Sequence, residues 1–101
     1  MKIDRIEDAG NITLKIEGWL DTNTSPELGA KVDEIKEAKS ITLDFDLVEY
    51  MSSAGLRQVV ATYKLAKELG ADFKVINTGK EVFNIFSLTG IDKKINITTK
   101  E

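Results

Sequence analysis

The stretch from residue 41 to residue 69 constrains the fold most, because its apolar pattern changes period part-way along. As far as residue 47 every second residue is apolar, which predicts a strand with one buried face. From residue 56 the apolar residues recur every three or four positions, which predicts a helix that ends at Gly70. The apolar positions are Ile41, Leu43, Phe45 and Leu47 in the strand and Leu56, Val59, Val60, Tyr63, Ala66 and Leu69 in the helix.

The first twenty residues predict a β-hairpin. Two short apolar runs, at 3–6 and 12–16, flank the turn-forming residues Asp8-Ala9-Gly10-Asn11. The second run alternates apolar and polar residues, as expected for a sheet with one buried face. The chain is expected to leave this strand at Gly18-Trp19-Leu20-Asp21.

A first helix is predicted after the hairpin. Thr24 is the expected N-cap, with Glu27 completing a capping box and Pro26 tolerated in the first turn. Leu28, Val32 and Ile35 follow at helical spacing, and the helix is expected to end near Ala38-Lys39.

The last third of the chain predicts a strand, a helix and a final strand. Phe73, Val75 and Ile76 mark the first of these strands, and Ile95 and Ile97 mark the last. A helix is predicted between these two strands, because Thr78 and Glu81 form a second capping-box pattern at its start and Gly90 lies at its end. Its apolar residues are Val82, Ile85 and Phe86.

The resulting order is β-β-α-β-α-β-α-β, which predicts an α/β fold. The sheet is expected to be mixed, because it starts with a hairpin, and to have about five strands flanked by three to four helices. With 101 residues, of which 42% are hydrophobic, the chain is expected to form one domain over residues 1–101.

The amino-acid composition excludes several classes of function. The chain has no cysteine and no histidine, which excludes thiol nucleophiles and Ser-His-Asp triads and removes the favoured ligands of zinc. A net charge of -3 without a basic stripe argues against nucleic-acid binding. The apolar runs are too short to cross a membrane and no signal peptide is evident, so we expect a cytoplasmic protein whose partner is another protein.

The strand that ends near Tyr50 leads into Ser52-Ser53-Ala54-Gly55-Leu56. This segment resembles the signature of STAS domains of the anti-sigma factor antagonist family, in which the second position is a phosphorylated serine or threonine. Gly18-Trp19-Leu20-Asp21 looks like the segment that precedes the first helix in that family. The stretch from Val82 to Ile91 looks like its C-terminal helix and glycine exit, so the resemblance covers nearly the whole chain.

The resemblance implies a STAS fold and a regulator rather than an enzyme, with no cofactor. In that family the unphosphorylated protein binds an anti-sigma factor and frees a sigma factor. The anti-sigma factor is commonly a serine kinase that phosphorylates the antagonist, and a metal-dependent serine phosphatase removes the mark. By resemblance Ser53 is the phosphoacceptor. The residues expected to bind or shape the partner interface are Asp21, Ser52, Ser53, Ala54, Gly55 and Leu56.

The residues alone leave alternatives open. A Ser-Ser pair before an apolar helix is often only an N-cap, and Gly55 can serve helix–strand packing alone. Because many family members have aspartate in place of Ser52, that serine remains an alternative phosphoacceptor. Two other functions stay open: a phosphorylation-independent scaffold or small-ligand sensor, and an enzyme that uses Ser53 as nucleophile.

Several acidic residues are expected near these serines. Asp44 and Asp46 alternate along a strand, which is typical of a solvated face rather than of a catalytic pair. Together with Asp21 and Glu49 they are expected to make this end of the sheet acidic. A phosphate on Ser53 is then expected to strengthen repulsion from an acidic partner surface.

Overall fold

The computed structural model describes residues 1–100 and contains every predicted element in the predicted order. A short 3-10 helix, η1, is the one addition within this range. The elements are β1 (Lys2–Asp8), β2 (Asn11–Leu20), α1 (Ser25–Asp33), β3 (Ser40–Met51), α2 (Ser53–Leu69), β4 (Asp72–Thr78), α3 (Lys80–Leu88), η1 (Ile91–Lys93) and β5 (Asn96–Thr99).

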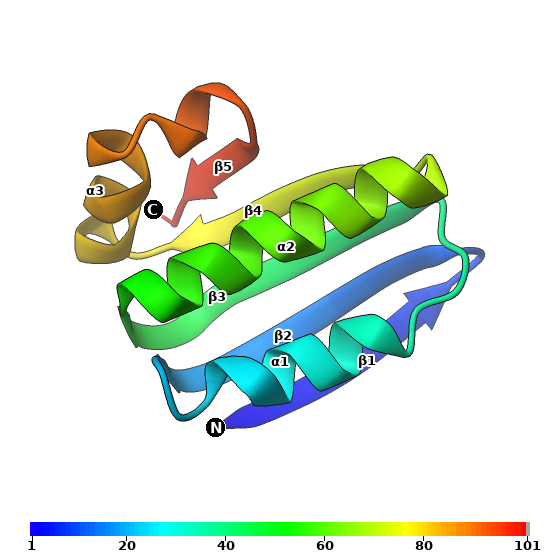
Figure 1. Ribbon diagram of the computed structural model, residues 1–101, viewed down its shortest axis with the longest axis horizontal. Coiled ribbons are helices and arrows are strands. Elements are labelled where there is room, and N and C mark those ends of the chain that lie inside the picture. The colour runs from blue at the N-terminus through cyan, green and yellow to red at the C-terminus, as the bar shows by residue number, and fades with distance from the viewer. Residues whose placement is uncertain (101) are drawn as a thin grey trace.

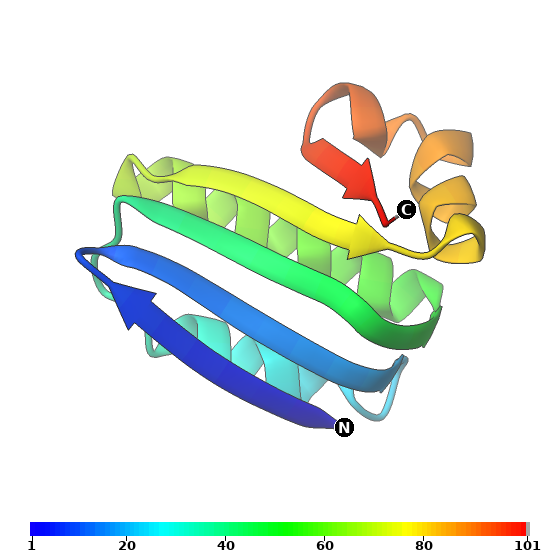
Figure 2. The same ribbon diagram turned by 180° about the vertical axis from the view of Figure 1, so that it is seen from behind.

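The five strands form one mixed sheet in the order β1-β2-β3-β4-β5. The β1–β2 hairpin is antiparallel and every other pair is parallel, so the sheet is mixed, as predicted. Helices α1 and α2 lie side by side on one face of the sheet, and α3 lies beyond β4 with β5 (Figure 1). Seen from behind, strands β1 to β4 form an open face that no helix within residues 1–100 covers (Figure 2).

The core fills the layer between the sheet and the helices. Alternate residues of β2 and β3 point into it and meet the apolar stripes of α1 and α2. Phe45 of β3 packs against Phe86 of α3 with ring centroids 6.3 Å apart, and both side chains are fully buried. Other members of the core are Ile12, Leu14, Ile16, Leu20, Leu28, Val32, Ile35, Ile41, Leu43, Val48, Met51, Val59, Ala66 and Val75.

The prediction that Leu47 faces the core is wrong, because β3 contains bulges. Its pairing with β2 slips by one residue between Asp44 and Leu47, and slips again between Val48 and Tyr50. An extra residue reverses the inside–outside alternation of a strand. Leu47 is therefore 54% exposed on the open face, while its neighbour Val48 is buried.

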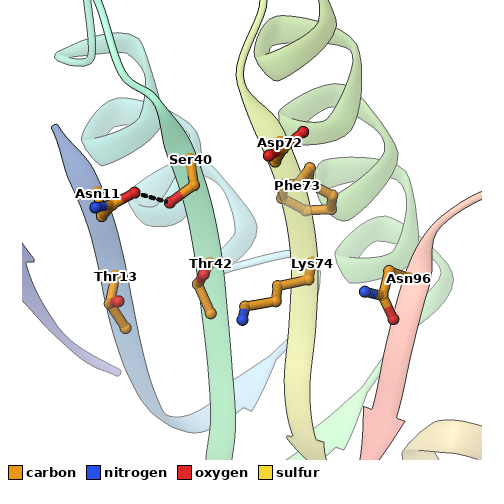
Figure 3. Close-up of a pocket in the computed structure, with 8 residues that line it drawn as sticks. All are labelled: Asn11, Thr13, Ser40, Thr42, Asp72, Phe73, Lys74 and Asn96. Atoms are coloured by element: carbon orange, nitrogen blue, oxygen red, sulfur yellow. Dashed lines mark hydrogen bonds between the residues drawn. The ribbon is translucent and has the colours of Figure 1, made fainter.

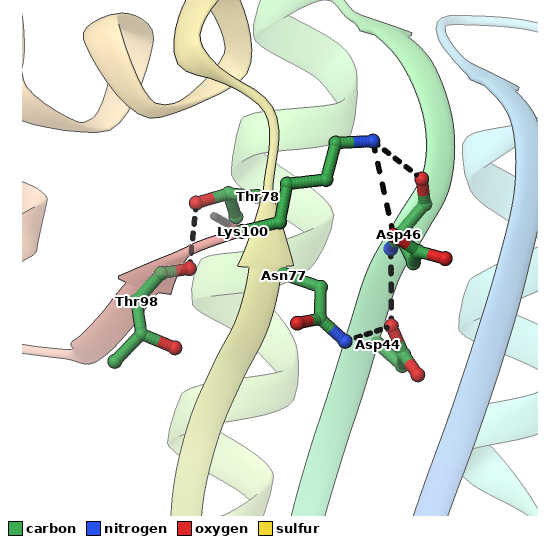
Figure 4. Close-up of polar contacts among 6 residues, drawn as sticks. All are labelled: Asp44, Asp46, Asn77, Thr78, Thr98 and Lys100. Atoms are coloured by element: carbon green, nitrogen blue, oxygen red, sulfur yellow. Dashed lines mark hydrogen bonds and ion pairs between the residues drawn. The ribbon is translucent and has the colours of Figure 1, made fainter.

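Residues of β3 and β4, together with Lys100 just after β5, hold the first bulge (Figure 4). One carboxylate oxygen of Asp44 accepts the backbone N–H of Asp46 at 3.0 Å and the side-chain amide of Asn77 at 3.1 Å. Lys100 donates its ammonium to the carbonyl oxygen of Asp46 at 2.8 Å, and the same nitrogen lies 3.8 Å from the Asp46 carboxylate. The end of the chain thus fixes the path of β3 as it approaches α2.

The start of α1 agrees with the prediction in position, and its end does not. Thr24 is the N-cap, as predicted, but it has helical backbone angles and its side chain makes no capping bond, so the predicted capping box is not formed. The helix ends at Asp33 rather than near Ala38-Lys39. The earlier end follows from tertiary contacts, since the N–H of Lys39 donates to the carbonyl of Gly10 at 2.7 Å in the hairpin turn.

The start of α3 also differs from prediction. The N-cap is Gly79, and Thr78 is the last residue of β4 rather than a cap. The Thr78 hydroxyl donates to the carbonyl of Thr98 in β5 at 2.8 Å, so it joins two strands (Figure 4). The prediction for the end of α2 is confirmed, because Gly70 caps it in the left-handed conformation with φ of 70°.

Candidate functional site

The two serines of the candidate site have different roles at the start of α2. Ser52 is the N-cap, and its hydroxyl oxygen accepts the N–H of Gly55 at 3.3 Å. Ser53 is the first residue of the helix, and its side chain is exposed. None of the hydrogen bonds found within residues 1–100 uses the Ser53 hydroxyl. Ser52 therefore has a structural task, and Ser53 has a free hydroxyl at the surface.

Gly55 lets the start of α2 approach the sheet. It is buried, and a Cβ atom at this position would overlap the carbonyl oxygen of Leu20 and lie 2.9 Å from the side chains of both Leu20 and Met51. The same Leu20 carbonyl accepts the N–H of Ser52 at 2.9 Å. Gly55 therefore shapes the site from beneath, as packing of the helix on the strands requires.

Asp21 organises the adjacent turn at the end of β2. Its carboxylate accepts the backbone N–H of Asn23 at 2.9 Å and that of Thr24 at 3.1 Å. The N–H of Thr24 is the main reason that the pKa of Asp21 lies below its ordinary value; the Thr24 hydroxyl and the N–H of Asn23 act in the same direction, against partial desolvation. β2 continues to Leu20, so the prediction that the chain leaves this strand from Gly18 onward is wrong.

The ends of β2 and β3 bring these residues together. Leu20 pairs with Met51 in the sheet, so the Asp21 turn lies beside Ser52 and the start of α2. The expected acidic end is smaller than predicted, because Asp44 and Asp46 lie on the open face, where Lys100 neutralises Asp46.

An apolar hollow runs along α2 from the first turn of the helix. It has a volume of about 360 Å³ and lies between α2 and the 3-10 helix. Arg57 and Lys64 flank it with positive charge, and on the neighbouring α3 the side chain of Leu88 is 87% exposed. The lining residues are Leu56, Arg57, Val60, Ala61, Lys64 and Ile91.

Comparison with the sequence patterns of known protein families matches residues 2–101 to the STAS domain. The chain belongs to the STAS domain family. This STAS domain is 28% identical over 101 residues to the anti-sigma-B factor antagonist of Bacillus subtilis strain 168, covering 99% of this chain and 93% of that protein. It is 24% identical over 104 residues to the anti-sigma F factor antagonist of Paenibacillus polymyxa, covering 100% of this chain and 89% of that protein.

Solved structures share the fold. An anti-sigma factor antagonist from Mycobacterium paratuberculosis superposes with a TM-score of 0.88 at 23% identity, covering 98% of this chain and 86% of that one. The Bacillus cell fate determinant SpoIIAA in its phosphorylated form gives a TM-score of 0.76 at 14% identity, covering 99% of this chain and 93% of that one. The predicted STAS fold is confirmed.

A second hollow, of about 600 Å³, lies on the open face of this STAS domain. Its polar side chains rise from β2, β3, β4 and β5, and Ser40 donates its hydroxyl to Asn11 at 2.8 Å (Figure 3). Ser40 begins β3, whereas Ser52 and Ser53 follow its last residue, Met51, so the hollow and these two serines lie at opposite ends of a 12-residue strand. The lining residues are Asn11, Thr13, Ser40, Thr42, Asp72, Phe73, Lys74 and Asn96.

Residues 1–100 offer neither a metal site nor a membrane span. No group of three or more acidic, histidine or cysteine side chains in this range is placed to hold a metal ion. No helix in the same part of the chain is both long and apolar enough to span a bilayer.

The α2 hollow was not predicted from the sequence. Leu56 and Val60 fit the apolar stripe of the helix and were expected in the core, but both are only half-buried. The sequence feature that could have revealed the hollow is the width of the apolar stripe, because the stripe has more apolar positions than one buried face of a helix needs. Trp19, whose environment the pattern left undecided, is 56% exposed.

The low pKa of Asp21 predicts an acid-sensitive turn. A carboxyl whose pKa is lower in the folded than in the unfolded state contributes stability above its unfolded pKa, and that contribution is lost as the pH falls through the folded value. The Asp21→Asn variant is therefore expected to lose less stability than the parent protein as the pH falls below about 4. An NMR titration of the Asp21 carboxyl carbon should give a midpoint below the ordinary aspartate value; a midpoint at or above it contradicts the assignment.

Proposed function

We propose that this STAS domain is an anti-sigma factor antagonist that binds a serine-kinase anti-sigma factor and is switched off by phosphorylation of Ser53. The observation that carries the proposal is the exposed Ser53 hydroxyl at the first position of α2. The curated relatives, which span the whole length of the domain, are named as antagonists of anti-sigma factors.

The geometry favours Ser53 over Ser52 as the phosphoacceptor. The Ser52 oxygen already accepts the N–H of Gly55, and substitution of a helix N-cap typically costs about 1 kcal/mol of stability. A kinase that modified Ser52 would have to break that cap, whereas the Ser53 oxygen has no bond to lose. When the Ser53 hydroxyl gives up its proton and its oxygen takes the phosphoryl group from ATP, no hydrogen bond of the fold is therefore broken.

A phosphate on Ser53 is tolerated by the fold because it lies at a helix N-terminus. Free N–H groups and the helix dipole favour an anion there, and the first turn of α2 contains no acidic residue. The switch therefore acts on the partner. A phosphate adds about -1.5 to -2 charges beside the Asp21 turn, which repels an acidic surface and fills the space that the partner occupies.

The partner surface that we propose extends from Ser53 along α2. Leu56 and Val60 supply apolar area in the α2 hollow, and Arg57 supplies positive charge at its rim. Such a combination fits a kinase surface with apolar side chains and carboxylates. Asp21, Ser52, Ala54 and Gly55 shape this surface rather than provide most of its contact area.

The remaining parts of the proposal follow from the family. Release of the sigma factor occurs when the anti-sigma factor binds this chain, and a metal-dependent serine phosphatase restores the binding form. The kinase supplies the chemistry, so we assign no catalysis or cofactor to this chain. Because these partners are cytoplasmic proteins, the chain acts in the cytoplasm in this proposal and binds neither nucleic acid nor a membrane.

Two substitutions of Ser53 test the switch. Ser53→Ala is expected to bind the kinase as well as the parent protein does but to resist phosphorylation. Ser53→Asp is expected to fold normally and to bind at least tenfold more weakly, which corresponds to about 1.4 kcal/mol. Titration calorimetry against the cognate anti-sigma factor measures both affinities.

Ser52→Ala is the matched control. It removes the cap but leaves the phosphoacceptor, so it is expected to lower stability by about 1 kcal/mol and still to accept phosphate. Equal affinity of the parent protein and Ser53→Asp would favour a phosphorylation-independent scaffold. Turnover of ester substrates that disappears in Ser53→Ala would favour an enzyme.

A further inference from the structure

A second exposed apolar surface lies on the open face of the sheet, opposite α2. Three of the five large apolar side chains that are exposed within residues 1–100 gather there and form the aromatic patch: Trp19, Leu47 and Tyr50. Trp19 and Tyr50 are paired in the sheet, and their ring centroids are 5.2 Å apart. Leu47 pairs with Glu17, two residues before Trp19, so it lies in the adjacent row of the same face.

The bulges of β3 create this patch. Without the extra residue after Asp44, the alternation of the strand would bury Leu47. The hydrogen bonds from Asn77 to Asp44 and from Lys100 to the carbonyl of Asp46 hold the bulged path (Figure 4). The structure thus maintains an exposed leucine beside two exposed aromatic rings, and apolar patches of this kind mark interaction sites.

Carboxylates outnumber ammonium groups around the patch. The two hollows that Leu47 lines contain five acidic residues and three lysines: Asp4, Glu17, Asp44, Asp46 and Glu49, and Lys2, Lys15 and Lys100. One of these hollows, of about 640 Å³, is lined by three acidic residues and one lysine. Lys100 is already bound to Asp46, and within residues 1–100 neither Glu17 nor Glu49 forms an ion pair. Glu49 accepts the indole N–H of Trp19 at 3.3 Å, which places its negative charge at the edge of the aromatic pair.

We propose that the aromatic patch is a docking surface for a cationic segment of another protein, in which arginine or lysine alternates with apolar side chains. An arginine of such a segment stacks on Trp19 or Tyr50 and pairs with Glu17 or Glu49, while its apolar neighbours cover Leu47. The carboxylates repel nucleic-acid phosphates and anionic lipids. A second copy of this chain would bring the same carboxylates to the contact, and the chain is acidic overall with a net charge of -3.

This surface is distinct from the one proposed for the kinase. The aromatic patch lies on the sheet face that is turned away from α2, whereas Ser53 and Leu56 belong to α2 itself (Figures 1 and 2). A phosphate on Ser53 therefore leaves the patch accessible. The two surfaces allow one domain to hold a kinase and a basic partner at the same time.

Fluorescence tests the proposal, because Trp19 is the single tryptophan of the chain. The full-length protein is titrated with a synthetic hexapeptide of alternating arginine and leucine, and with the same peptide carrying glutamate in place of arginine. The arginine peptide is expected to shift Trp19 emission saturably and to bind at least tenfold more tightly than the glutamate peptide. Its affinity is expected to fall with rising salt.

Charge-reversal variants locate the site. Replacing Glu17 and Glu49 together with lysine is expected to weaken binding of the arginine peptide at least tenfold, as measured by calorimetry. The matched control replaces Glu34 and Glu68, exposed residues on the helical side, and is expected to retain the affinity, as is Ser53→Asp. Three results would overturn the proposal: binding of the arginine peptide that does not saturate at millimolar concentration, equal affinity for both peptides, or an equal loss of affinity in the two double variants. Self-association abolished by the Glu17 and Glu49 changes would overturn it in favour of a second copy.

Because the peptide titration contains no kinase, its outcome is independent of the switch at Ser53. Loss of peptide binding in the patch variants with normal phosphorylation of Ser53 supports the second surface alone. Failure of phosphorylation with peptide binding intact contradicts only the proposed function.

Discussion

Replacing Gly55 with alanine is expected to lower the free energy of unfolding by about 3 kcal/mol, as measured by urea denaturation. The new Cβ atom overlaps the carbonyl oxygen of Leu20 and crowds the side chain of Met51. The carbonyl cannot move freely because it also accepts the N–H of Ser52. The Met51 side chain cannot move freely because it is buried. The start of α2 must therefore shift away from the sheet, and with it the serines.

Gly29→Ala is the matched control for this change. Gly29 also lies within a helix, and a Cβ atom there would meet only the end of the Gln58 side chain, at 3.0 Å. That side chain can rotate away, and alanine favours the helix over glycine by about 1 kcal/mol. Gly29→Ala is therefore expected to change stability by no more than about 1 kcal/mol. Similar losses in both variants would show that Gly55 has no special role in packing.

Replacing Phe86 with alanine is expected to cost about 4 kcal/mol of stability, a larger loss than we expect from Gly55→Ala. Phe86 is fully buried and is the ring through which α3 packs on Phe45 of β3. Its removal leaves a cavity between α3 and the sheet. Within residues 1–100 no other pair of aromatic rings connects this helix to the sheet. A domain of this size has a total stability of about 5 to 15 kcal/mol, so the thermal midpoint should fall by well over 10 °C.

Leu88→Ala provides the comparison in the same helix. Leu88 is 87% exposed, so its truncation removes little buried area and is expected to change stability by less than about 0.5 kcal/mol. Thermal unfolding followed by circular dichroism measures both variants. An equally stable Phe86→Ala variant would contradict the assignment of α3 to the core.

The sequence predicted the order of the elements because each one has a local signal. The apolar period sets α2, and Gly70 ends it in the conformation that glycine favours. The hairpin follows from the turn residues between β1 and β2. Such features depend on neighbours in the chain and so can be found without a structure.

The errors occurred where distant residues decide the local conformation. The bulge that exposes Leu47 depends on Lys100, which is 54 residues from Asp46 in the sequence. α1 ends early because Lys39 binds the hairpin turn at Gly10. Thr78 matches a capping box, but its hydroxyl is bound to β5 instead. No pattern within a short window contains these contacts.

The candidate site was predicted in part. The sequence placed Ser52 and Ser53 between β3 and α2; in the structure Ser52 lies there as the N-cap, and Ser53 is already the first residue of α2. It did not distinguish the cap from the free hydroxyl, because both serines suit a helix N-terminus. The aromatic patch was also missed, since the exposure of Trp19 and Tyr50 depends on which sheet face the helices leave open.

The central claim is that Ser53 is the residue through which a kinase controls this domain. The most direct test is tandem mass spectrometry of the protein after incubation with ATP, magnesium and the serine-kinase anti-sigma factors encoded in the same genome. We predict one phosphate per chain, on Ser53, and none on the Ser53→Ala variant. Phosphate on Ser52 instead, or no phosphate with any of these kinases, would contradict the claim.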